Sequence, residues 1–346
     1  MIKTDIAIVG GGIIGIVIAR EIIKNTPDAS ISIFEKRISG SGSSFYSAGV
    51  HFPRGVNPRV QKMSLYSHNY YQGLIGGNTP IYPLTMELIT HSAHLDKTLS
   101  NYLPLAEFNP VITSLNSDIE LSEQKELTIL QGKGGHYADV FKLVNLFMHE
   151  LRLQVDIHEG ISVDSLERQD NGYLLGLSSS EQVSASKVIL APGPWLVEPA
   201  WRDRIADLGV RIKKIVAVHI AQVPAANAPL SIFHDDDAFL LPCHSRNHWL
   251  FSYTCQEWDV KPKDITALQS QDIETAKNVL SRYSQALAKK IHDGRVFCDA
   301  YSASREPVIT QLDEGLIYAG GASGSGYRLA PAIASEVVAL LSQTNT

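Results

Sequence analysis

The sequence has little cysteine, no excess of positive charge and no long hydrophobic run. Its three cysteines, Cys243, Cys255 and Cys298, are an odd number without metal-type spacing, which argues against a disulfide framework and a zinc site. They favour a reducing, cytoplasmic location. Because 30 basic residues stand against 36 acidic ones, for a net charge of −6, we expect no concentrated positive surface for nucleic acid or an anionic membrane. Small molecules are therefore the expected partners.

The most apolar stretch, from Ile6 to Ala19, is too short and too rich in glycine to span a membrane. A spanning helix needs about 20 residues, and we expect no membrane span. The composition, with 44% hydrophobic and 19% charged residues, is ordinary for a globular protein, and 346 residues suggest about two domains.

The first residues read as a βαβ unit. Thr4 to Val9 is a short β-branched run, Gly10 to Gly12 is a turn, and Ile13 to Lys24 is an apolar helical stretch. A second strand is expected from Ser30 to Phe34, just before Glu35. The two strands should be parallel, as in other βαβ units.

Further along, the pattern predicts more strands and helices but leaves the region from about His51 irregular, because prolines interrupt short segments there. Apolar residues at helical spacing predict helices over Ala138–Leu151 and Ile265–Lys290, and a last helix is expected from about Pro331. The acidic run from Asp235 to Asp237 predicts a solvated turn. Strands are expected over Gln154–His158, Tyr173–Leu177, Lys187–Leu190, Ile212–Val223, Ala238–Leu241, His248–Tyr253 and Leu316–Ala319.

The motif Gly10-x-Gly12-x-x-Gly15 lies between the predicted strand and helix, and Glu35 ends the next strand. In a dinucleotide fingerprint the first glycine makes the tight turn, the second lets the backbone approach a pyrophosphate, and the third allows close packing of helix on strand. Glu35 would accept a hydrogen bond from a ribose 2′-hydroxyl, which disfavours a 2′-phosphorylated cofactor. The fingerprint alone does not separate NAD from FAD.

Three later motifs follow the fingerprint in a fixed order. They are Ser43-Ser44 with Ala48-Gly49, then the stretch from Ala191 to Trp195, then the run Gly-Gly-Ala-Ser-Gly-Ser-Gly-Tyr-Arg-Leu-Ala-Pro that ends at Pro331. Their order and spacing resemble those of the D-amino-acid oxidase family of FAD enzymes, which includes glycine and sarcosine oxidases. The resemblance covers essentially the whole chain.

This resemblance implies an α/β fold in which a Rossmann-type FAD-binding domain is interleaved with a substrate domain built on an antiparallel sheet. The FAD-binding domain would comprise residues 1–50, 131–211 and 296–346, and the substrate domain residues 51–130 and 212–295. The residues expected to bind FAD are Gly10, Gly12, Ile13, Ile14, Gly15, Glu35, Lys36, Ser43, Ser44, Ala48, Gly49, Ala191, Gly193, Trp195, Gly321, Gly324, Ser325, Gly326, Tyr327, Arg328 and Leu329.

The reaction that the resemblance implies is oxidation of a C–N bond, in which a small amine or amino or imino acid loses hydride to flavin N5 and the imine then hydrolyses. Arg328 and, second, Arg54 are the expected ligands of a substrate carboxylate, since a guanidinium forms bidentate pairs with it. Tyr301 and Tyr327 would flank the substrate, and His51 is the candidate proton carrier.

The stretch from Cys298 to Ile309 departs from the family pattern, because it lacks the strand Arg that clamps the substrate carboxylate in D-amino-acid and glycine oxidases. The substrate is then held by Arg328, or it is not a simple α-amino carboxylate. Cys298 lies near the position where some sarcosine oxidases attach FAD through a thioether, although its spacing is one residue off, so we expect non-covalent FAD.

The electron acceptor stays open between O2 and another molecule. Some sarcosine oxidases use a lysine for oxygen activation, and the comparable strand, His248 to Tyr253, contains none. Two other readings remain: an NAD-dependent dehydrogenase, motivated by the fingerprint alone, and a flavoprotein of the same fold that serves as a binding or assembly factor. The substrate, its stereochemistry and the oligomeric state are left open.

Overall fold

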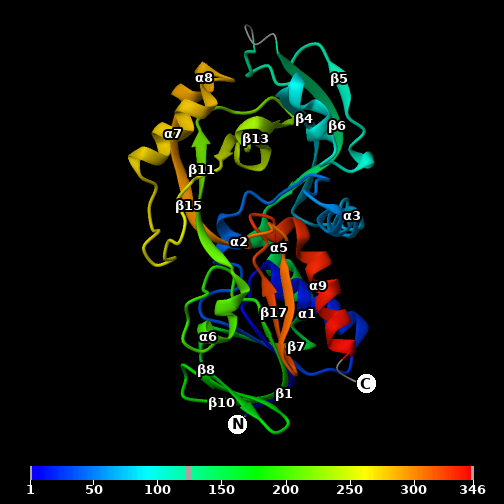
Figure 1. Cartoon of the computed structure of the whole chain (residues 1–346), viewed down its shortest axis with the longest axis vertical. Coiled ribbons are helices and arrows are strands. Elements are labelled where there is room, and N and C mark those ends of the chain that lie inside the picture. Colours follow the sequence, from blue (N-terminus) through cyan, green and yellow to red (C-terminus); the bar gives the residue numbers. More distant parts are fainter. Residues whose placement is uncertain (1, 122–125, 344–346) are drawn as a thin grey trace.

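The computed structural model describes residues 2–121 and 126–343, so the outermost ends of the predicted domain ranges, residues 1 and 344–346, and residues 122–125 lie outside the described residues. The described chain forms two sheets, one in each half of the molecule (Figure 1). Both ends of the described chain lie in the half that contains β1 and α9.

The first sheet has the order β16-β17-β10-β1-β2-β7, and β9 and β8 continue from β10. The pairs β10–β1, β1–β2, β2–β7 and β10–β17 are parallel, which confirms the predicted parallel βαβ unit. The last four residues of β1 and the last three of β10 are buried without interruption, as in a parallel sheet that is covered on both faces. The bounds are β1 Ile2–Val9, β2 Ile31–Glu35, β7 Val155–Glu159, β8 Val163–Gln169, β9 Gly172–Leu177, β10 Gln182–Leu190, β16 Val308–Asp313 and β17 Leu316–Gly320.

One face of this sheet is covered by α1 (Ile13–Asn25), α5 (Val140–Leu151) and α9 (Gly326–Gln343), which share one hydrophobic core with β1, β2, β10 and β17. Asp139 caps α5 by accepting a hydrogen bond from the Lys142 amide at 3.2 Å. Helix α1 packs against both α5 and α9. The mixed α/β fold with a Rossmann-type unit is therefore as predicted.

The second sheet has the order β15-β11-β14-β13-β12-β4-β6-β3, with β5 beside β6. Its strand pairs are antiparallel except for β12–β4, which are parallel. Helices α7 (Ser270–Leu280) and α8 (Gln285–Lys289) share a core with it. The bounds are β3 Val50–His51, β4 Ile81–His91, β5 Asn109–Val111, β6 Leu127–Ala138, β11 Arg211–Ile220, β12 Leu230–Phe233, β13 Ala238–Cys243, β14 His248–Tyr253 and β15 Ile291–Tyr301.

Several elements differ from the sequence prediction. The region expected to be irregular contains α3 (Pro58–Gln72) and the long strands β4 and β6. Asn57 caps α3 by accepting from the Val60 amide at 3.0 Å, a cap-then-proline signal that sequence reasoning missed. The predicted helix over 265–290 is two helices, α7 and α8, and the strand expected to reach residue 223 ends at Ile220.

The last helix begins at Gly326, five residues before the predicted start at Pro331. A proline inside a helix offers no N–H to the carbonyl four residues earlier. The Tyr71 hydroxyl of α3 donates to that carbonyl, on Tyr327, at 2.6 Å, so a neighbouring helix supplies the missing hydrogen bond.

Shorter helices connect these strands, and none of the helices in the described ranges is long and apolar enough to cross a membrane. They are the α-helices α2 Ser43–Tyr46, α4 Leu95–Leu99 and α6 Arg202–Ile205, and the 3-10 helices η1 Ser92–His94, η2 Pro104–Ala106, η3 Ala206–Leu208, η4 His234–Asp236 and η5 His244–Arg246.

The predicted division into two domains stays a prediction. Two segments that it assigns to the FAD-binding domain, residues 131–138 of β6 and 296–301 of β15, pair with strands of the second sheet.

Candidate functional site

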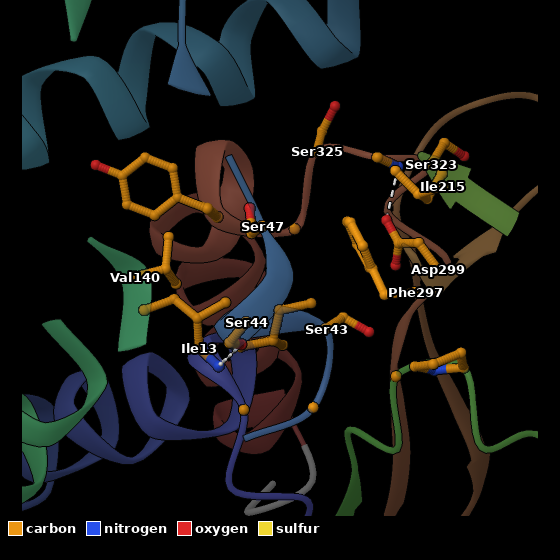
Figure 2. A pocket seen from close by; sticks show the side chains of 18 of the residues that line it. Ile13, Ser43, Ser44, Ser47, Val140, Ile215, Phe297, Asp299, Ser323 and Ser325 are labelled. Atoms are coloured by element: carbon orange, nitrogen blue, oxygen red, sulfur yellow. Dashed lines mark hydrogen bonds between the residues drawn. The ribbon is translucent and has the colours of Figure 1, made fainter. Parts of the chain in front are cut away.

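A cavity of about 700 Å³ lies where the two halves meet. Figure 2 shows Ile13, Ser44 and Val140 on one side of it and Phe297 and Asp299 of β15 on the other. The carboxyl ends of β1, β2 and β10 open into it, the edge where α/β sheets bind ligands. Among the predicted cofactor-binding residues, the cavity is lined by Gly10, Gly12, Ile13, Ile14, Glu35, Lys36, Ser43, Ser44, Ala48, Gly49, Ala191, Gly193, Trp195, Gly324, Ser325, Gly326, Tyr327 and Arg328.

The turn between β1 and α1 is open to a ligand because it is made of glycine. Gly10 has a φ of +111°, and a Cβ there would collide with the Ala191 carbonyl. No side chain caps α1 at Gly12, and a Cβ on Gly12 would meet only Ser44 Oγ, at 3.5 Å. The Ile13 amide donates to Ser44 Oγ at 3.0 Å (Figure 2). The start of α1 thus suits a pyrophosphate group.

Glu35 closes this end of the cavity. Its Oε2 accepts from the Gly11 amide and its Oε1 from the Arg37 amide, each at 2.9 Å, so the carboxylate is held at the end of β2. A carboxylate has about four lone-pair sites, which leaves capacity for a ribose hydroxyl. Lys36 is engaged elsewhere, in an ion pair with Glu198 at 3.0 Å and over the Trp195 ring at 4.4 Å.

Three of the predicted cofactor-binding residues are not on the cavity wall. A Cβ on Gly15 would collide with the Gly10 carbonyl oxygen, so Gly15 acts through close packing of α1 on the turn, as predicted. Gly321 has a φ of +59° and packs against Val210 and Val308, and Leu329 of α9 points into the hydrophobic core.

A second helix also begins at the cavity. Gly324, Ser325 and Gly326 line it where α9 starts, so the positive end of the dipole of a long helix faces the cavity. The Gly324 amide donates to Asp299 Oδ2 at 2.9 Å (Figure 2), which fixes the glycine run against β15. This arrangement favours negative charge next to the run.

Asp299 is a cavity residue that sequence reasoning missed as a site residue. Burial raises the pKa of this carboxyl to about 6, although the amides of Ala300 and Gly324 donate to it. Within the described ranges, Asp299 forms no ion pair: no lysine, arginine or histidine nitrogen lies within 4.0 Å of its carboxylate oxygens. The sequence signal that could have identified Asp299 as a site residue is its position as an acid within the apolar stretch from Val296 to Tyr301.

Arg328 and Arg54, the predicted carboxylate ligands, both line the cavity. The partly buried Arg328 guanidinium donates to the Arg54 carbonyl oxygen and, at 2.7 Å, to Ser325 Oγ. Burial and then the charge of Arg54 lower the pKa of Arg328. Arg54 Nε is buried and has no hydrogen-bond partner in the described structure, where neither arginine forms an ion pair. This end of the cavity therefore offers two uncompensated positive charges to an anion.

Of the three predicted catalytic residues, Tyr301 lines the cavity, and burial raises the pKa of its hydroxyl, which stays neutral. Tyr327 lines it too, but its hydroxyl is hydrogen-bonded to His136 Nε2 at 3.1 Å. His51 is fully buried, stacks on His136 at 4.5 Å and is not among the lining residues. Burial and then His136 lower its pKa well below the usual range. Because strand neighbours point to opposite faces, Val50 faces the cavity and His51 does not.

Cys298 is buried between strands and is also absent from the cavity wall. Burial, and then Asp299, raise the pKa of its thiol to about 11, so it lacks the thiolate character of a reactive cysteine. The surroundings of Cys298 give no support to a thioether link.

Lys213 and Asp237 are among the other ionisable residues of the wall that were not predicted as site residues. The run from Asp235 to Asp237, predicted to be a solvated turn, is only partly so. Asp235 pairs with His94 at 2.7 Å and Asp236 with Arg282 at 2.7 Å, while Asp237 lines the cavity.

The fold matches solved structures over nearly its whole length. Glycine oxidase from Geobacillus kaustophilus aligns with a TM-score of 0.83 and 17% identity, over 99% of this chain and 95% of that chain. L-proline dehydrogenase from P. horikoshii aligns at 0.80 and 19% identity, over 99% and 94%. L-alpha-glycerophosphate oxidase from Mycoplasma pneumoniae, with FAD bound, aligns at 0.80 and 17% identity, over 99% and 95%.

No curated protein matches the sequence. The family model for FAD dependent oxidoreductases, DAO, matches residues 5–340, nearly the whole chain. This match sets aside the NAD-dependent reading and agrees with the glycine turn, Glu35 and the two helix N-termini at the cavity. The chain belongs to the DAO family of FAD-dependent oxidoreductases, and its cofactor is FAD.

Proposed function

We propose that this oxidoreductase oxidises the C–N bond of a small amino or imino acid. The observation that carries the proposal is the pair Arg328 and Arg54, two cations without an ion-pair partner in the described structure, in the cavity that also holds the glycine turn. The names of two structural neighbours, a glycine oxidase and an L-proline dehydrogenase, favour an amino or imino acid. The three buried free cysteines are consistent with the cytoplasmic location that we also propose.

In this proposal, the C–H bond at the substrate α-carbon breaks with both electrons, the nitrogen lone pair forms the C=N bond, and water hydrolyses the resulting imine. When bound, FAD would supply the hydride acceptor, and O2 or another molecule would then take up the electrons. The chain's own residues position the substrate. Arg328 and Arg54 hold its carboxylate, and the apolar walls from Phe52, Ile215 and Phe297 exclude water from the reacting carbon.

Tyr301 is the predicted catalytic residue whose side-chain position best fits contact with a substrate, as a neutral hydrogen-bond donor or acceptor. His51 lies behind the wall, so in this proposal it positions Tyr327 through His136 and does not carry a proton from the substrate. A substrate amine that is already neutral needs no side-chain base.

The test is an anaerobic titration of the FAD-loaded protein with glycine, N-methylglycine, proline, D- and L-alanine, D- and L-glutamate and glycerol 3-phosphate, followed by air. We expect an amino or imino acid to bleach the flavin band, and the rate of recovery in air will distinguish an oxidase from a dehydrogenase. The matched variant Arg328→Met should need a far higher substrate concentration than the wild type for the same bleaching of the flavin band. Bleaching by glycerol 3-phosphate alone would refute C–N oxidation, and a flavin that stays oxidised with every compound would favour a binding or assembly role.

A further inference from the structure

A buried lysine faces the cavity on the side of the second sheet. Lys213 lies on β11, is only 4% exposed and lines the cavity. Its Nζ lies 4.8 Å from the centre of the Trp258 ring and 5.1 Å from that of Tyr301. Aromatic faces attract a cation but do not neutralise it. In the described ranges, no carboxylate oxygen lies within 4.0 Å of this ammonium group.

The next residue shows how the same fold neutralises a buried lysine. Lys214 points to the opposite face of β11, and its Nζ pairs with Glu257 at 2.7 Å and with Asp272 at 2.8 Å. Both partners act to raise the pKa of Lys214. At Lys213, by contrast, burial lowers the pKa, Arg305 adds to the shift, and the opposing Asp237 does not reverse it. The cavity therefore holds an ammonium group that lacks a close counter-charge.

Two acids of the cavity wall are neighbours of Lys213 in the fold, but neither carboxylate lies within 4.0 Å of its Nζ, and each accepts hydrogen bonds from other groups. Asp299 is its register partner on β15, but the carboxylate accepts from the backbone amides of Ala300 at 2.8 Å and Gly324 at 2.9 Å. Asp237 accepts the Thr254 hydroxyl hydrogen bond at 2.6 Å. With no acid of the described residues within ion-pair distance, a close counter-charge for Lys213 would come from a molecule in the cavity.

We propose that Lys213 binds a second acidic group of the substrate, so that the preferred amino acid carries a carboxylate or a phosphate-type group in addition to the carboxylate held by Arg328 and Arg54. This inference rests on the proposed function, because it takes those two arginines as the site of the first carboxylate. A hydrogen bond between charged groups shielded from water is strong enough to set specificity.

The test uses non-oxidisable acids, so that it does not depend on turnover. Propionate, succinate and 3-phosphonopropionate are titrated into the FAD-loaded protein while the flavin absorbance band reports binding. We expect succinate or 3-phosphonopropionate to bind at least about tenfold more tightly than propionate. Their ranking shows whether the second group is a carboxylate or a phosphonate. In Lys213→Met this advantage should disappear while propionate binds as before, and Lys213→Arg should restore most of it.

Lys97→Met removes an exposed lysine that does not line the cavity and serves as the matched control. FAD content and melting temperature check that each variant is folded. Equal affinities for propionate and the diacids in the wild type, or an unchanged preference in Lys213→Met, would overturn the inference. Failure of every amino acid to reduce the flavin would instead count against the proposed function, since the binding titration gives its own answer.

Discussion

The two halves of the cavity are built from different parts of the chain. At the carboxyl ends of the first sheet, the wall is largely backbone, with glycines such as Gly10 and Gly12 and the first turns of α1 and α9. On the second sheet, the wall is made of side chains, among them Lys213, Asp299 and Tyr301. A backbone site depends on glycine and leaves a motif in the sequence. A side-chain site depends on which residues of a strand face inward, and no fixed motif records this.

The largest effect should follow from adding a side chain to the glycine turn at the first-sheet side of the cavity. In Gly15→Ala the new Cβ would collide with the Gly10 carbonyl oxygen, a backbone atom that moves only if the turn moves. We expect a loss of about 3 kcal/mol in the free energy of unfolding, at the upper end of ordinary overpacking costs, and FAD binding at least about 100-fold weaker. Urea unfolding and fluorescence titration with FAD measure the two quantities.

Gly12→Ala separates packing from cofactor binding at the same turn. Its Cβ would meet only Ser44 Oγ at 3.5 Å, an ordinary contact, so the protein without FAD should keep its stability while FAD binding weakens. Gly77→Ala, outside the cavity wall and with its nearest contact at 3.4 Å, is the control and should change neither. Normal FAD affinity in Gly12→Ala would show that a pyrophosphate does not approach this turn.

The contrast between the halves also explains how much could be predicted from the sequence. The prediction of the βαβ unit was correct because β-branched strands, a glycine turn and an apolar helix are local signals in the sequence. Helix α3 was missed because its apolar periodicity is weak, and the helix it packs against, α9, lies far away in the sequence. The start of α9 was placed at Pro331 because its first turn depends on a hydrogen bond from Tyr71, far away in the sequence.

The site follows the same rule. The cavity is lined by most of the residues taken from glycine-rich motifs, whereas His51 lies behind the wall and Lys213 and Asp299 were not predicted. The sequence alone does not tell which of the adjacent Lys213 and Lys214 faces the cavity, because that depends on the parity of β11 in its sheet. Family resemblance supplied Arg328 and Arg54, which do line the cavity.

An intermediate effect is expected at the charged end of the cavity. Arg328→Met should raise the KM for an amino acid substrate by about 50-fold, because hydrogen bonds between ions contribute roughly 1.5–3 kcal/mol each. The value of kcat should change less, since the guanidinium holds the carboxylate in both the ground state and the transition state. Steady-state kinetics with the substrate identified by the flavin titration measure both constants.

Thermal unfolding gives this variant a second readout. Arg328 carries a partly buried charge without an ion-pair partner in the described structure, so an apolar replacement of similar length should leave the melting temperature unchanged or higher. Arg328→Lys should recover part of the KM, because it restores the charge without the planar geometry. A KM equal to that of the wild type in both variants would remove Arg328 from the substrate site.

The smallest effect concerns Asp299. This side chain of the second sheet holds the glycine run before α9 by accepting a hydrogen bond from the Gly324 amide. Burial raises the pKa of Asp299 to about 6, so the folded protein binds this proton more tightly than the unfolded chain does. The ionised carboxylate therefore costs stability above pH 6, and the cost falls as the pH drops from 6 towards 4. Between pH 8 and pH 5, the wild type should gain about 1 kcal/mol in the free energy of unfolding relative to Asp299→Asn, which does not titrate.

Urea unfolding of the two FAD-loaded proteins at both pH values measures this difference. The variant Asp156→Asn, which changes an exposed aspartate, is the control. If the gap between wild type and Asp299→Asn is the same at both pH values, Asp299 does not titrate abnormally in the fold, and its contribution is limited to the hydrogen bonds from Ala300 and Gly324.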